Sequence, residues 1–110
     1  MAEKRVSERV STKLVAEVVR EEAFECVSTE VVDVSRGGLR VRTNARVLTG
    51  EDVLLTVTLG GRQLDAHGYV ARVIHGRRTG ETGERYLGLR FTYLDEPSQH
   101  ALDTWLAKAC

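Results

Sequence analysis

Residues 31–41 read VVDVSRGGLRV, a pattern of two short strands around a turn. Both halves are rich in Val and alternate apolar with polar side chains, which is typical of strands with one buried face. Between them Asp33, Ser35 and two glycines supply the side-chain hydrogen bonds and conformational freedom of a tight turn. The stretch therefore predicts two antiparallel strands joined by a turn over residues 35–38.

The same alternation recurs on both sides of this stretch. Period-two apolar segments lie at residues 14–18, 24–34, 39–43, 53–59, 62–75 and 87–93. In the fifth of them the apolar phase shifts around Gly68, which predicts a bulge or bend at that glycine. Short antiparallel strands of this kind close into a barrel or pack as a sandwich. The sequence thus predicts a mainly β domain of about six strands.

The C-terminal end has helical spacing instead. Leu102, Trp105, Leu106 and Ala109 follow the i, i+3, i+4, i+7 pattern of one apolar stripe. Asp95 is a residue type that caps a helix, and a proline two residues later is tolerated in the first turn. We expect one helix over about residues 96–109, packed on the sheet.

Residues 1–11, MAEKRVSERVS, are charged and lack apolar alternation. They predict a flexible arm ahead of a single domain over residues 12–110. One domain is expected because a single core usually serves roughly 100–150 residues.

The charges balance, with 16 Lys and Arg against 16 Asp and Glu, so the molecule as a whole has no field for generic nucleic-acid or membrane binding. No segment approaches the roughly 20 apolar residues that span a bilayer, and the N-terminus has no apolar signal core. We therefore expect a cytoplasmic protein that binds neither nucleic acid nor membranes, in which any anion site is local.

No set of catalytic residues can be assembled from the sequence. The three histidines form no metal-binding or catalytic spacing, and the two cysteines form no CxxC pair. Ser35 lies in DVSRG rather than G-x-S-x-G and suits a turn hydrogen bond better than a nucleophile. The glycine-rich segment 76–84 lacks the G-K-[ST] end of a phosphate-binding loop. We expect no enzyme, no metal and no cofactor.

Two motifs remain, Arg5-x-x-x-Arg9 in the arm and Asp33-x-Ser35-x-x-Gly38 at the turn. With both in this order, the segment RYLGLRFTYLD near the end and a terminal helix, the chain resembles the PilZ domain family over nearly its whole length. The resemblance implies a six-stranded antiparallel β-barrel with one C-terminal helix. It also implies a receptor that binds cyclic di-GMP and signals to an effector protein, whose identity the sequence leaves open.

The ligand-binding residues implied by the resemblance are Lys4, Arg5, Arg9, Asp33, Ser35 and Gly38. Guanidinium groups fit phosphates and the guanine acceptors O6 and N7, and a carboxylate fits the guanine donors N1 and N2. Lys4 stands where many members of the family carry a further Arg, so one ligand or a stacked pair both stay open. Arg40 and Arg42 are expected to point outward, where they either extend the site or face solvent.

The order of the motifs also predicts a conformational change, in which the arm folds across a ligand bound at the turn. Ordering about eight arm residues costs roughly 8–16 kcal/mol. Several charge-assisted hydrogen bonds, at roughly 1.5–3 kcal/mol each, must outweigh that cost. Binding of moderate affinity with a large conformational response is expected.

Other functions stay open beside this one. Asp33 and Ser35 also suit a purely structural role in the turn. The first alternative is a PilZ-type protein–protein interaction module that does not bind nucleotide. A weaker one is a barrel that binds single-stranded nucleic acid through Arg40 and Arg42, but aromatic residues are only 5% of the chain.

Overall fold

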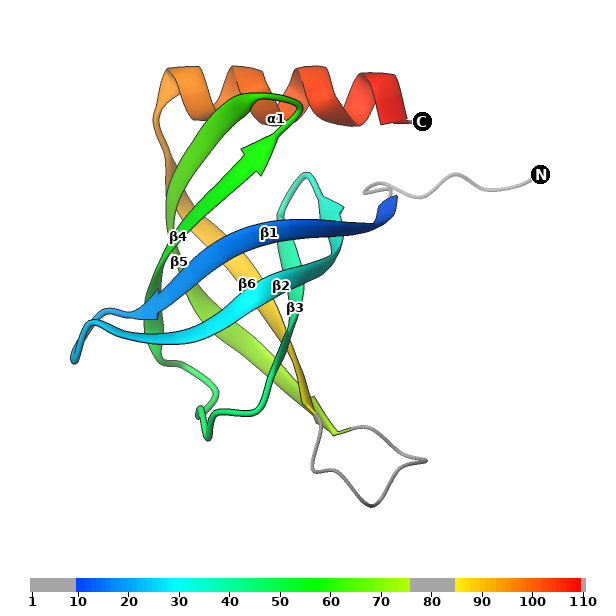
Figure 1. The fold of residues 1–110 in the computed structure, drawn as a ribbon. Coiled ribbons are helices and arrows are strands. Elements are labelled where there is room, and N and C mark those ends of the chain that lie inside the picture. The colour runs from blue at the N-terminus through cyan, green and yellow to red at the C-terminus, as the bar shows by residue number, and fades with distance from the viewer. Residues whose placement is uncertain (1–9, 76–84, 110) are drawn as a thin grey trace.

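The described residues, 10–75 and 85–109, form a closed antiparallel barrel of six strands with one helix at its C-terminal end (Figure 1). The structure is a computed structural model. Its elements are β1 Val10–Arg20, β2 Glu25–Ser35, β3 Gly38–Thr43, β4 Asp52–Leu59, β5 Arg62–His75, β6 Arg85–Leu94 and α1 Glu96–Ala109. The predicted barrel and helix are confirmed. Lys4, Arg5, Arg9, residues 76–84 and Cys110 lie outside the described residues.

The strands follow the order β1-β2-β3-β6-β5-β4, and β4 pairs with β1 to close the barrel. Strands β1, β2 and β3 form one meander, β4, β5 and β6 form another, and the β3–β6 pairing joins them. Closure leaves none of the described strands with an unpaired edge, which removes the usual site of edge-to-edge association.

Inward-facing Val and Leu side chains fill the barrel, as the alternation predicts. Burying such a side chain fully contributes roughly 1.5–3 kcal/mol. The largest fully buried side chains are Leu39, Leu55, Leu64, Leu87, Leu102, Val18, Val31, Val34, Val41, Val53, Val57 and Val70.

The core face of β5 does not change at Gly68. Ala66, Gly68 and Val70 are all buried in one phase, and the phase changes only after Val70. There Ala71 is the extra residue of a register shift against β6. The pairing with β6 does shift between His67 and Gly68, as expected, but the extra residue there belongs to β6, and the apolar phase of β5 changes three residues later than expected. Gly68 serves a close approach instead, because a Cβ there would lie 2.5 Å from the carbonyl oxygen of Arg90.

A bulge in β6 turns Tyr93 outward. The β5–β6 register shifts between the pairs His67–Tyr93 and Gly68–Phe91, which makes Thr92 the extra residue. Phe91 consequently packs against the core, whereas Tyr93 is 60% exposed and lies edge-on to the ring of His67. The expected core alternation of this strand holds through Phe91 and fails at Tyr93.

Helix α1 lies across one end of the barrel and packs on β5 and β4 (Figure 1). The Asp95 carboxylate accepts a 3.0 Å hydrogen bond from the Ser98 backbone N–H, so Asp95 caps the helix. The Ser98 hydroxyl in turn accepts a 2.9 Å hydrogen bond from the Asp65 N–H of β5. The buried face comprises Ser98, Ala101, Leu102 and Leu106. Ala109, expected in the apolar stripe, is exposed because the last turn extends past the sheet.

Within the described residues, no helix has the length and apolarity that crossing a membrane requires.

Two of the hairpin turns use the left-handed region of backbone conformation. Gly60 and Gly61 have φ angles of 57° and 85°, which makes the two-residue turn between β4 and β5 a type I′ turn. In the β1–β2 turn the residue at positive φ is Phe24, with φ 53°. A bulky side chain there is strained, whereas glycine is not.

Candidate functional site

The Asp33–Gly38 segment forms a compact polar corner of the barrel. Strand β2 ends at Ser35, β3 begins at Gly38, and these two residues are paired. The Ser35 hydroxyl donates a 3.3 Å hydrogen bond to the Gly38 carbonyl oxygen, and the Phe91 N–H donates a 2.9 Å bond to the Gly37 carbonyl oxygen. The predicted turn is thus tied both to itself and to β6.

Gly38 has no room for a side chain. A Cβ built there would lie 1.8 Å from the backbone carbonyl oxygen of Leu89, because β6 crosses closely over the start of β3. Steric exclusion, rather than a positive φ angle, therefore requires glycine at the last position of the D-x-S-x-x-G motif. The close crossing fixes the corner against β6.

Asp33 is placed on the outer face of the barrel by a bulge at Val32. The β2–β3 register runs from Val31 opposite Val41 directly to Asp33 opposite Arg40, so one residue of β2 is extra. The Asp33 residue is only 8% exposed, and its carboxylate lies 3.6 Å from a guanidinium nitrogen of Arg40. This distance is longer than a direct hydrogen bond, so the contact is a loose ion pair.

The described chain begins beside this corner. Val10, the first residue of β1, is paired with Val34, which lies between Asp33 and Ser35. The Arg5-x-x-x-Arg9 motif directly precedes Val10 in the sequence. The structure thus brings Asp33, Ser35 and Gly38 together, while Lys4, Arg5 and Arg9 lie outside the described residues.

Sequence reasoning did not identify a second group of residues on the same outer face. Arg40 of β3, Arg72 of β5 and Arg90 of β6 surround a shallow pocket of about 340 Å³ over Gly88 (the Gly88 pocket). Because their neighbours in the strand point inward, Gly88 and Arg90 must point outward, and this could be predicted from the sequence. The expected phase shift in β5 also turned Arg72 outward, although the bulge that does so lies at Ala71 rather than at Gly68.

Arg42 has a different environment from Arg40. Both point outward from β3, as predicted, but a guanidinium nitrogen of Arg42 lies 3.4 Å from the Glu30 carboxylate. Both of these side chains are about two-fifths exposed, and such surface pairs contribute roughly 0–1 kcal/mol. Arg42 therefore belongs to a solvated ion pair on the strand face.

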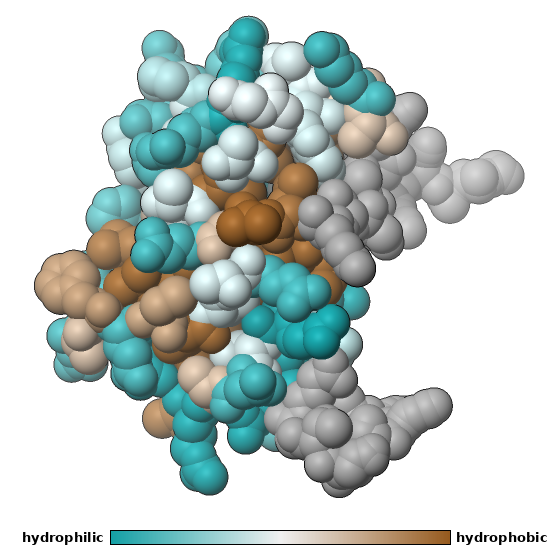
Figure 2. Space-filling model, in the orientation of Figure 1, coloured by the Kyte–Doolittle hydropathy of each residue, from teal (hydrophilic) through white to brown (hydrophobic). Residues whose placement is uncertain are grey.

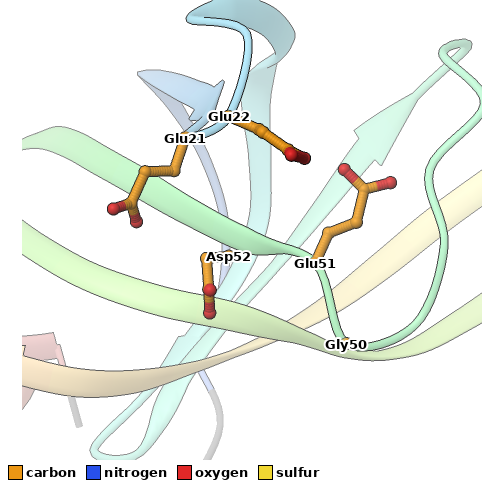
Figure 3. A pocket seen from close by; sticks show the side chains of 5 residues that line it. All are labelled: Glu21, Glu22, Gly50, Glu51 and Asp52. Carbon is orange, nitrogen blue, oxygen red and sulfur yellow. The ribbon is translucent and has the colours of Figure 1, made fainter.

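A second pocket of about 490 Å³ has the opposite charge. It is lined by Glu21 and Glu22 of the β1–β2 turn and by Gly50, Glu51 and Asp52 at the start of β4 (Figure 3). We refer to it as the acidic pocket. Its lining repels phosphate groups, so it does not suit an anionic ligand.

One of these carboxylates already has partners. An oxygen of Glu51 lies 3.0 Å from the Arg20 guanidinium, and another accepts a 2.9 Å hydrogen bond from the Leu48 N–H. The Glu51 side chain therefore ties the loop before β4 to β1.

The histidines stand apart from one another. His67 contacts Tyr93, His75 ends β5, and His100 lies on the exposed side of α1. Among the residues of the described part of the chain, no group of three His, Cys, Asp or Glu side chains is arranged to hold a metal ion.

The similarity to known proteins covers nearly the whole chain. The family model described as PilZ domain matches residues 3–108. No curated protein matches the chain.

Similar solved structures show the same fold. The inhibitor of motility MotI/DgrA of Bacillus subtilis has a TM-score of 0.78 at 20% identity, over 97% of this chain and 51% of that protein. This chain therefore spans about half the length of that relative. The PilZ domain with c-di-GMP of YcgR from Escherichia coli has a TM-score of 0.75 at 12% identity, over 97% of this chain and 92% of that domain. The PilZ domain of CeSA from a cellulose-synthesizing bacterium has a TM-score of 0.65 at 17% identity, over 92% of this chain and 97% of that domain.

Proposed function

The chain belongs to the PilZ domain family, and from that premise we propose that it is a receptor for cyclic di-GMP that signals to a partner protein. In this proposal Asp33, Ser35 and Gly38 form the seat of the ligand. Arg5 and Arg9, with Lys4 beside them, close over it when the arm becomes ordered. The protein acts by binding and requires no cofactor.

The observation that carries the proposal is the polar corner built by the D-x-S-x-x-G motif. Its carboxylate and hydroxyl lie beside the first residues of β1, and the arginine motif directly precedes that strand. The similar PilZ domain of YcgR was solved with c-di-GMP. The family, the fold and the position of the motif therefore support one function.

The chemistry of the ligand matches these residues. Cyclic di-GMP offers two phosphodiester charges and two guanines, and guanidinium groups bind phosphates or guanine acceptor edges in bidentate fashion. The carboxylate of Asp33 can accept hydrogen bonds from guanine N1 and N2. The open space at Gly37, where a Cβ would meet no atom within 4 Å, leaves the tip of the turn accessible to a ligand.

Isothermal titration calorimetry of cyclic di-GMP into the purified chain tests the proposal, with cyclic di-AMP and GTP as controls. We expect saturable binding that is selective for cyclic di-GMP. Arg9→Ala and Asp33→Ala should abolish it, whereas the matched control Asp52→Ala in the acidic pocket should bind like the wild type. Absence of binding heat with the wild type would refute the proposal.

Thermal unfolding of the free proteins separates a ligand-binding role of Asp33 from a structural one. Arg40 is 38% exposed and stays hydrated when Asp33 is removed, so the loss of this ion pair alone costs about 1 kcal/mol or less. A ligand-binding role of Asp33 predicts a small change in Tm with a complete loss of binding. A large loss of Tm would assign Asp33 to the stability of the turn instead.

A second candidate function, docking on a partner protein without nucleotide, is favoured by the β1–β2 hairpin. Phe24 at its tip is 74% exposed although its backbone lies at positive φ. Figure 2 shows hydrophobic surface over this hairpin, at the left of the view. A strained, exposed aromatic side chain is a common feature of interaction sites. The same titration separates the two functions, because a docking module gives no heat with cyclic di-GMP.

A further inference from the structure

Three arginines converge on the outer face of β3, β6 and β5. The pairing places Arg40 beside Gly88 and Gly88 beside Arg72, so these residues form a row across three adjacent strands. Arg90 lies two residues beyond Gly88 on the same face of β6 and also lines the pocket. Because adjacent strands are about 4.8 Å apart, the row brings the side chains within reach of one small anion.

Gly88 forms the floor of this pocket. A Cβ there would make only ordinary contacts, the nearest at 3.6 Å from Cγ of Arg72. Unlike Gly38, this glycine is therefore not required by the packing of the barrel. Its effect is to leave backbone rather than side chain beneath the guanidinium groups, which deepens the pocket.

The positive charge of the Gly88 pocket is poorly neutralised. Arg40 has the loose ion pair with Asp33, at 3.6 Å. Arg72 and Arg90 make no ion pair with any carboxylate among the described residues. The repulsion energy between like charges is inversely proportional to their separation, so a bound anion stabilises three neighbouring guanidinium groups.

The pocket adjoins the proposed ligand site through Arg40, which contacts Asp33 and lines the pocket. We propose that the Gly88 pocket is a second subsite of the receptor, which binds a phosphodiester group of the cyclic dinucleotide seated on the Asp33–Gly38 corner. This inference rests on the proposed function. In the free protein Arg40 partly neutralises Asp33. When guanine donors satisfy Asp33, Arg40 turns to the phosphodiester beside Arg72 and Arg90.

Calorimetric titration of cyclic di-GMP into the full chain and its arginine variants tests the subsite. One charge-assisted hydrogen bond is worth roughly 1.5 kcal/mol or more, so Arg72→Gln and Arg90→Gln should each weaken binding about tenfold. The double variant should weaken it roughly 100-fold. Arg62→Gln is the matched control, since Arg62 is exposed at the start of β5 and does not line the pocket. It should bind within about twofold of the wild type.

Gly88→Ala provides a test that changes no charge. Its Cβ makes only ordinary contacts, so Tm should be maintained, while the raised floor should weaken cyclic di-GMP several-fold. Inorganic phosphate alone is the probe for a general phosphate site, and it should compete only weakly with the dinucleotide.

The outcomes distinguish the subsite from the receptor function. If the wild type binds and the arginine double variant binds equally well, the subsite is wrong and the proposed function stands. If Arg62→Gln loses as much affinity as Arg72→Gln, the effect is one of overall charge and the subsite is again wrong. Tight binding of inorganic phosphate alone overturns a subsite for the dinucleotide. If the wild type shows no binding, both proposals fail together.

Discussion

The Gly88 pocket and the acidic pocket differ in charge and in the way they are built. The Gly88 pocket lies on strand faces, so the register of β3, β6 and β5 fixes the directions of its arginines. The acidic pocket is made by a turn and the end of a loop, where Phe24 and Gly50 have φ angles of 53° and 96°. The two pockets share no strand.

A chain with 16 cations and 16 anions can therefore still have surface regions that each prefer ligands of one charge. Zero net charge excludes a field over the whole molecule, but it does not exclude separated regions of opposite sign. The ligand proposed above is anionic and suits the arginine side, and a partner with basic side chains would suit the acidic side.

The largest expected effect tests how rigid the arginine side is. Gly38→Ala places a Cβ 1.8 Å from the Leu89 carbonyl oxygen, so β3 and β6 must separate. We expect a loss of stability on the order of 3 kcal/mol or more, measured by urea unfolding. Gly37→Ala is the control, because a Cβ there meets no atom within 4 Å, and it should cost less than about 0.5 kcal/mol. Equal stability of the two variants would show that the crossing is not rigid.

A smaller effect is expected on the acidic side. Glu51→Gln removes the charge that faces Arg20, whose side chain is 21% exposed, and leaves a neutral acceptor for the Leu48 N–H. The free energy of unfolding should fall by about 1 kcal/mol, because solvent screens the Arg20–Glu51 ion pair only in part. Affinity for cyclic di-GMP should not change. A change in affinity would contradict the separation of the two regions.

Phe24→Asn should change stability in the opposite direction. Asparagine tolerates the left-handed region better than phenylalanine, and this side chain is 74% exposed, so little packing is lost. We expect a gain of roughly 0.5–1 kcal/mol in urea unfolding. Phe24→Ala keeps the backbone strain and serves as the control. A loss of stability in the asparagine variant would show that the phenylalanine ring packs on the barrel.

The smallest expected effect concerns the helix cap at Asp95, which lies outside both pockets and contributes to the dependence of stability on pH. Hydrogen bonds from the Ser98 side chain and then its backbone N–H hold the pKa of Asp95 below its usual 3.8. Because the folded-state pKa is lowered, the carboxylate stabilises the fold above pH 3.8, and this contribution disappears as the pH falls through the lowered pKa. Asp95→Asn should remove this part of the dependence of Tm on pH. An unchanged profile would show that the cap does not contribute.

The alternation of apolar residues predicted the barrel well where strands are regular. In β3 and β4 every inward position expected from the sequence is buried, because period two alone determines the face. In β5 the apolar pattern indicated a phase shift but not its position at Ala71, and in β6 nothing in the pattern marked the extra residue Thr92. Tyr93 was therefore expected in the core and lies outside it.

The candidate site was predictable in the same uneven way. The D-x-S-x-x-G motif is contiguous in the sequence, so Asp33, Ser35 and Gly38 could be proposed together. The steric reason for Gly38 involves Leu89, which is 51 positions away, and only the fold reveals it. The same is true of the Gly88 pocket, whose arginines come from three strands.

Heteronuclear NMR of the chain titrated with cyclic di-GMP tests the central claim most directly, with glycine amides as reporters on both sides. Gly38 and Gly88 lie at the corner and the pocket floor, whereas Gly50, Gly60 and Gly61 lie at the acidic pocket and the β4–β5 turn. We predict that the amide signals of Gly38 and Gly88 shift with the ligand and that the other three stay in place. Shifts at Gly50 with none at Gly38 and Gly88, or no shift at any glycine, would contradict the account.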